Sequence, residues 1–161
     1  MTPLPESTLV LCFACTLLTP CAAGGLALTN AGLGRSRNAS HSLLSTLTVF
    51  ATATLVYFAA GFAWLGYAGR PEHDLTIAGN VWNWSGAERF LMRGVEFDGS
   101  ALSLAAVLGM LSAGLVSIIP LGAAAERWRL GSACASTALL SGLTFPLFAH
   151  WSWAGGWACR W

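Results

Sequence analysis

The chain has 161 residues, of which 55% are hydrophobic, and its formal net charge is +1 at pH 7. Charged residues make up 9% of the chain, whereas a typical soluble domain carries about 25%. This composition excludes a disordered chain, an ordinary soluble enzyme and a basic protein that binds nucleic acid.

Four long windows of the sequence contain no Asp, Glu, Lys or Arg. They are residues 7–34, 38–69, 99–125 and 130–159. Each window is longer than the ~20 apolar residues that a helix needs to cross the hydrocarbon core of a bilayer. The sequence therefore predicts an all-α, multi-pass membrane protein in which residues 1–161 form a single membrane domain.

The first predicted span covers about residues 8–31. Pro20 lies near its middle, and because proline removes a backbone donor we expect the helix to be interrupted there. Cys12 and Cys15 have the spacing of a redox or metal pair, but the span holds no second pair and no His. Small side chains buried in the membrane are the favoured interpretation of both cysteines.

The second predicted span covers about residues 42–67 and places Ser45, Thr48 and Thr52 on one face. We expect these hydroxyls to hydrogen-bond to their own helix or to a neighbouring one, and a polar pore lining is the alternative. The connection that follows, residues 70–98, is a long acidic loop with three Arg against five acidic residues.

The third and fourth predicted spans cover about residues 101–125 and 132–153. His150 lies near the end of the fourth, where a hydrogen-bonded structural histidine is favoured over a residue on a transport pathway. In the third span, small residues recur at every fourth position, a pattern that lets another helix approach closely. These residues are Ala101, Ala105, Gly109, Ala113 and Ser117.

Loop charges predict the orientation of the chain in the cell (inner or plasma) membrane. The connection between the first two spans holds Arg35 and Arg37 and no acid. The connection before the fourth span, residues 126–129, has a net charge of +1. Basic connections remain in the cytoplasm, so we expect both termini and the acidic loop 70–98 to lie on the extracytoplasmic side.

The four windows lack the buried charges that proton relays, ion-coupled transporters and voltage sensors need. The sequence also shows no nucleophile–base set, no phosphate-binding loop and no cluster of metal ligands. We therefore expect no enzymatic activity, no cofactor and no metal site. We therefore expect this chain either to conduct a neutral solute or to leave the chemistry to another segment.

Three segments, found in the right order, are typical of one family. Gly25–Asn38 has a glycine-rich helix end that leads into basic residues and an Asn. Pro120–Leu130 contains an Ala-Glu-Arg core, and Phe145–Trp157 is similar to a Pro-x-x-x-His-x-x-Trp-Gly-Gly segment. Together these segments resemble the N-terminal portion of the ammonium transporter (Amt/Rh) family, about its first four transmembrane helices.

The resemblance implies a homotrimer whose subunits have about eleven helices, each subunit with its own narrow hydrophobic pore. This family recruits ammonium at an outer vestibule by cation–π contact, deprotonates it and passes ammonia along the pore. Trp153 matches the tryptophan of that vestibule, and Trp offers the best aromatic face for a small cation. Trp153 is therefore the substrate-binding residue that the resemblance implies.

This sequence also departs from the family pattern. One of the two stacked phenylalanines that gate the family's pore corresponds to Ser112, so the gate is altered here. The family's Asp and its two pore histidines would come after Trp161, and His150 is neither of those histidines. Glu126 and Arg127 match a structural turn before the fourth helix, where a Glu favours the positive end of the helix.

The predicted function is transport of ammonium or ammonia across the bilayer, as part of an ammonium transporter-like protein that is incomplete alone. The expected partners are ammonium or ammonia, lipid, and either further copies of the chain or the missing helices of the same transporter. Three alternatives remain open at this point. They are a non-transporting truncated remnant, an interaction subunit of a membrane complex and an ammonium-binding membrane sensor.

Overall fold

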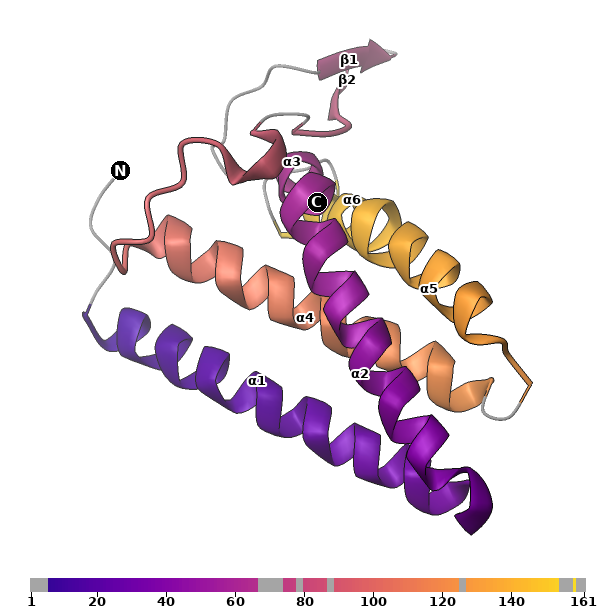
Figure 1. The fold of residues 1–161 in the computed structure, drawn as a ribbon. Helices are drawn as coiled ribbons and strands as arrows, with labels where there is room; N and C mark the ends of the chain where they lie inside the picture. Colours follow the sequence, from indigo (N-terminus) through magenta and orange to yellow (C-terminus); the bar gives the residue numbers. More distant parts are fainter. Residues whose placement is uncertain are drawn as a thin grey trace.

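The computed structural model describes residues 6–66, 74–77, 80–86, 89–124, 127–153 and 158. Within these ranges, four helical stretches pack together as a bundle (Figure 1) and are long and apolar enough to cross a membrane. The predicted multi-pass helical fold is confirmed. The four stretches are Glu6–Leu33, Ala39–Leu65, Ala101–Ala123 and Leu130–Ser152.

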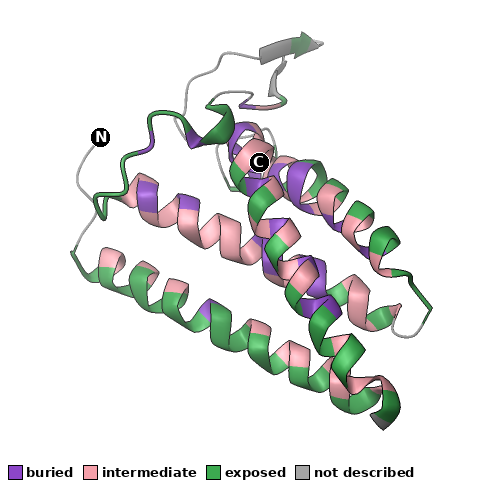
Figure 2. Cartoon of the chain, in the orientation of Figure 1, coloured by how far each residue is buried: buried purple, intermediate pink, exposed green. Residues whose placement is uncertain are grey.

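The first span is one continuous helix, α1 (Glu6–Leu33), so the interruption expected at Pro20 is absent. Membrane helices tolerate proline where hydroxyl side chains and neighbouring helices supply other hydrogen bonds. In the turn before Pro20, the hydroxyls of Thr16 and Thr19 each donate to a carbonyl four residues earlier, at 2.8 Å. α1 lies on the outside of the bundle, where most of its residues are exposed or half-buried (Figure 2).

The second and fourth spans each contain one turn of π-helix. The second span consists of α2 (Ala39–Val56), the π-turn η2 (Tyr57–Gly61) and α3 (Phe62–Leu65). The fourth span consists of α5 (Leu130–Leu139), the π-turn η4 (Leu140–Thr144) and α6 (Phe145–Ser152). A π-turn shifts the direction of the side chains around it and is frequent at functional sites.

The two π-turns pack directly against each other. A methyl group on Gly61 would lie 2.7 Å from the backbone oxygen of Ser141, and one on Gly142 would lie 2.8 Å from the side chain of Val56. Both distances are shorter than van der Waals contact, so glycine at these two positions lets the second and fourth spans meet closely.

The helix α4 (Ala101–Ala123) packs against both α1 and α2. The close approach predicted for its small residues is confirmed for part of the helix, because Ala113 and Ser117 are buried and Gly109 lies against the hydroxyl of Tyr57. Ala101 and Ala105 instead border a cavity. Small residues in the second half of α4 therefore allow close helix packing, whereas small residues at its start leave open space.

Hydroxyls on α2 bond within their own helix, as expected. Thr48 donates to the carbonyl of Leu44, and Thr52 donates to the carbonyl of Thr48, both at 2.8 Å. The hydroxyl of Ser45 lies 3.5 Å from Nε2 of His41, one turn earlier.

The long connection between α3 and α4 adds a small antiparallel hairpin to the helical fold. Its strands are β1 (Asp74–Ile77) and β2 (Asn80–Asn83), with Asp74 opposite Asn83. The 3-10 turn η3 (Phe90–Met92) follows. The connection is attached to the helices by Met92, whose buried side chain joins Tyr57 in the core.

The hairpin connection also meets the end of the second span through backbone contact. The N–H of Gly86 donates to the carbonyl of Trp64 at 3.2 Å. Gly66 ends α3 in the left-handed conformation, with φ +61°, and lies so close to Gly86 that a side chain on either residue would strike the other's backbone. Glycine at both positions is thus required by this contact.

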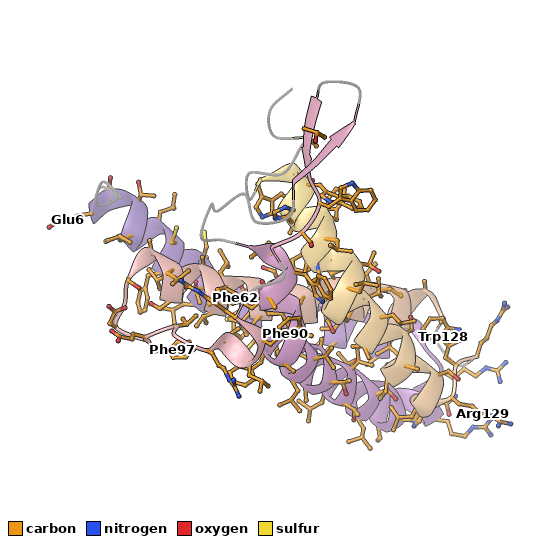
Figure 3. All side chains as sticks on the ribbon, turned by 90° about the horizontal axis from the view of Figure 1, so that it is seen from above. Glu6, Phe62, Phe90, Phe97, Trp128 and Arg129 are labelled. Carbon is orange, nitrogen blue, oxygen red and sulfur yellow. The ribbon has the colours of Figure 1, made fainter. Side chains whose placement is uncertain are left out.

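The basic turns lie at one end of the bundle and the start of α1 lies at the other. Figure 3 places Trp128 and Arg129 at the end opposite Glu6. The short 3-10 turn η1 (Ser36–Asn38), which follows Arg35, joins α1 to α2. The two ends of the bundle therefore differ in charge, which is the pattern used above to orient the chain.

Candidate functional site

A cavity of about 340 Å³ lies at the end of the bundle where α1 and α4 begin and α3 and α6 end. Aliphatic side chains supply most of its wall, and none of the described residues that border it is charged. Five side chains give the wall its polar or aromatic chemistry. They are Cys12 of α1, Tyr57 of η2, Ser112 of α4, Phe145 of α6 and Trp153 at the end of α6.

The sequence of α4 explains how one helix provides so much of this wall. Positions 101, 105, 108, 109 and 112 all border the cavity, and residues three or four apart share one face of a helix. Small residues at 101, 105 and 109 leave the space, while Leu104 and Leu108 make it apolar. The spacing of small residues that allows close packing at Ala113 and Ser117 therefore leaves room for the cavity at the start of α4.

Trp153 lies at the rim of the cavity and is 61% exposed. It follows the last residue of α6, and its backbone N–H donates to the backbone carbonyl of Ala149 at 3.0 Å. Its ring stands nearly perpendicular to the ring of Phe148, with centroids 6.2 Å apart. A fixed and accessible indole can attract a cation through its π-electrons.

Ser112 borders the same cavity as Trp153, so the structure brings these two predicted site residues together. Where the family resemblance places a phenylalanine, the serine side chain leaves the cavity open. The altered position is therefore a wall residue of the candidate site.

Tyr57 is a cavity residue that the sequence analysis missed. Its side chain is fully buried, and its hydroxyl has no hydrogen-bond partner among the residues that the structure describes. Its ring packs at 6.2 Å from the ring of Phe145, which also borders the cavity. A tyrosine deep inside an otherwise apolar window was the available signal, because a buried hydroxyl needs a partner.

His150 has the structural role that the sequence analysis favoured. It is 2% exposed, and its Nδ1 lies 2.8 Å from the carbonyl oxygen of Leu65. Since a carbonyl can only accept, Nδ1 carries the hydrogen of this bond. The bond satisfies a carbonyl in the last turn of α3 and joins the second span to the fourth.

The predicted structural turn at Glu126 and Arg127 is only partly visible. Glu126 lies outside the described residues, so its proposed effect on the following helix stays a prediction. Arg127 is exposed, and its backbone N–H donates to the backbone carbonyl of Ala124 at 3.0 Å. Arg127 does not border the cavity, because it lies near the opposite end of the bundle.

The acidic loop lies close to the entrance of the cavity. The indole N–H of Trp151 on α6 donates to the carbonyl of Trp84 in this loop at 3.0 Å. Asp98, three residues before Ala101, is exposed, and hydrogen bonds from the Ser100 hydroxyl and N–H lower the pKa of its carboxyl. Asp98 is therefore ionised at neutral pH, and negative charge near an entrance raises the local concentration of cations.

A second and smaller cavity, of about 160 Å³, lies at the opposite end of the bundle. It is bordered by Asn30, His41, Ser45 and Trp128, among others, and is more polar. Along α4, the stretch from Ser112 to Leu121 separates the two cavities by about 13 Å.

The cysteines do not form a metal or redox centre in the part of the chain that the structure covers. There, no group of three or more His, Cys, Asp or Glu side chains is arranged to hold a metal ion. Cys12, Cys15, Cys21 and Cys134 are free thiols. Cys12 borders the large cavity as a small side chain, in keeping with its interpretation from the sequence.

These features define a polytopic helical membrane protein with an aromatic-rimmed, uncharged cavity at one end of its bundle. The chain belongs to the Ammonium Transporter Family, whose model matches residues 8–161. Its four spanning helices fit part of the fold of that family. No solved structure matches the chain.

Two curated relatives are named as ammonium transporters. The chain is 27% identical to "Ammonium transporter Amt2" of Archaeoglobus fulgidus over 143 residues, which cover 89% of this chain and 28% of that protein. It is 31% identical to "Ammonium transporter" of Bacillus subtilis over 154 residues, which cover 92% of this chain and 35% of that protein. The chain thus spans about a third of the length of these relatives.

Proposed function

We propose that this chain takes part in transport of ammonium or ammonia across the membrane and that Trp153 binds the ammonium ion. The observation that carries this proposal is the exposed indole of Trp153 at the rim of an uncharged cavity. A cation at the indole needs no buried counter-ion, since the ring quadrupole supplies the attraction. Family membership and the names of the relatives support the same substrate.

The wall of the cavity favours loss of charge beyond the rim. Burial of an ion among aliphatic side chains is very costly without a partner, and the part of the wall that the structure describes contains no charged side chain. We propose that ammonium stays at Trp153 and that neutral ammonia occupies the interior. Ser112, in place of the family's gate phenylalanine, makes this interior roomier.

We also propose the orientation predicted from the loop charges, with both termini and the cavity outside the cytoplasm. In a cysteine-free background, Ser36→Cys is expected to react with a membrane-impermeant maleimide only after cells are permeabilised. Thr76→Cys, exposed on β1, is the matched control and is expected to react on intact cells. Labelling of position 36 from outside would reverse the proposed orientation.

A complete conduction path is proposed to need more helices than this chain supplies, because the chain covers 28% and 35% of the two ammonium transporters that it matches. By the family resemblance, we propose a homotrimer. The test is a chimaera in which residues 1–161 replace the matching segment of the Bacillus subtilis transporter, expressed in a host without its own ammonium transporters. We expect the chimaera to restore growth on limiting ammonium and the chain alone to give little uptake.

A chimaera that reaches the membrane at the relative's level but gives no uptake would contradict the transport proposal. That outcome favours an interaction subunit, for which α1 is the supporting observation. Its apolar side chains are largely uncovered, with Val10 67% and Leu28 69% exposed. Co-purification of the chain with a full-length relative would then identify that function.

A further inference from the structure

The hydroxyl of Tyr57 is a buried polar group to which the described residues supply no partner. The residue is 0% exposed and borders the large cavity, and its hydroxyl makes no hydrogen bond to any described residue. Such a group costs free energy unless something in the cavity pairs with it. A phenolic hydroxyl can both donate and accept a hydrogen bond.

The surroundings of Tyr57 hold this hydroxyl in place. Its position in the π-turn η2 puts the ring against Phe145, and the hydroxyl lies against Gly109, where any side chain would collide with it. Gly109 and Ser112 are three residues apart on α4 and border the same cavity. Glycine at one position and serine at the other thus leave the hydroxyl beside open space.

We propose that Tyr57 binds neutral ammonia in the cavity through its hydroxyl. The phenolic O–H donates a hydrogen bond to the lone pair of ammonia. This inference rests on the proposed function, because it names where the transported species is held after Trp153. It makes the cavity favour a small neutral molecule that accepts a hydrogen bond.

The two sites differ in the species that they bind, and this difference separates them experimentally. Trp153 attracts the ammonium cation, whereas the uncharged interior binds ammonia. Between about pH 6 and pH 8, the ammonia fraction of total ammonium rises about tenfold per pH unit, so apparent affinity at Tyr57 rises likewise. Among the described residues that border the cavity, Tyr57 and Cys12 are the titratable ones. Arg89 and Arg93, which flank η3, are exposed.

The test is titration of the purified full chain in lipid nanodiscs with ammonium chloride at several pH values, with sodium chloride as the salt control. We expect a pH-dependent binding phase that Tyr57→Phe weakens by about five- to tenfold, the range for loss of one hydrogen bond. Ser117→Ala is the matched control. It also removes a buried hydroxyl, but one already bonded to the carbonyl of Ala113 at 2.8 Å.

Thermal unfolding distinguishes a binding role from a structural one. Because the hydroxyl has no partner among the described residues, Tyr57→Phe is expected to keep or raise the unfolding temperature and to lose the stabilisation that ammonium gives at higher pH. A lowered unfolding temperature with an unchanged response to ammonium would overturn the inference. Absence of the pH-dependent phase in the unmodified chain would also overturn it.

Trp153→Leu, measured in parallel, separates this inference from the function on which it rests. Loss of the Trp153-dependent phase with unchanged binding in Tyr57→Phe refutes the role of Tyr57 and leaves the proposed function standing. Unchanged binding in Trp153→Leu with weakened binding in Tyr57→Phe has the opposite meaning. It supports the role of Tyr57 and refutes recruitment at Trp153.

Discussion

Replacement of Gly61 by alanine is expected to destabilise the folded chain by about 3 kcal/mol, the upper range for overpacking a tight contact. The added methyl group would lie 2.7 Å from the backbone oxygen of Ser141. A backbone oxygen cannot move aside as the end of a flexible side chain can. The second and fourth spans must therefore separate at their π-turns, which also displaces Tyr57.

The matched control is Gly25→Ala in α1, where no heavy atom lies within 4 Å of the added methyl group. That change is expected to be neutral or to stabilise by up to about 1 kcal/mol, since alanine favours a helix more than glycine does. Denaturant unfolding in mixed micelles, followed by circular dichroism, measures both variants. Equal stability of the two variants would contradict the close contact between the π-turns.

The helical membrane fold could be predicted from the sequence because it depends on one-dimensional information. Windows without charged residues identify spans wherever burial in lipid excludes ions. The interruption expected at Pro20 was wrong because the sequence alone does not show whether a helix continues through a proline. In the structure α1 runs without a break from Glu6 to Leu33.

The π-turns and the hairpin could not be predicted in the same way. An extra residue in one helical turn leaves no mark in an apolar window, since every residue around Tyr57–Gly61 is apolar or aromatic. The strands Asp74–Ile77 and Asn80–Asn83 are each four residues long. Such short strands give too little alternation to be distinguished from an irregular loop.

For the candidate site too, some residues could be predicted from the sequence and others could not. Resemblance to the family identified Trp153 and Ser112 as separate positions, and the structure adds that both border one cavity. The cavity depends on the relative placement of α1, α4 and α6, which no local pattern contains. Tyr57 was missed because its importance comes from an unpaired hydroxyl, a property of the packed structure.

The central claim is that Trp153 binds ammonium at the rim of the cavity, and its loss is expected to have the largest effect on affinity. A desolvated cation–π contact with tryptophan contributes about 2 kcal/mol, which corresponds to roughly thirtyfold in affinity, and a more exposed one contributes less. Trp153 is 61% exposed, so a decrease of about tenfold is expected for Trp153→Leu.

The most direct measurement is ammonium binding by the purified chain in nanodiscs near pH 6, where almost all of the solute is the cation. Trp128→Leu is the control, since Trp128 is also partly exposed but lies at the opposite end of the bundle (Figure 3). The predicted result is about tenfold weaker binding for Trp153→Leu and unchanged binding for Trp128→Leu. Equal affinity of Trp153→Leu and the unmodified chain would contradict ammonium recruitment at this site.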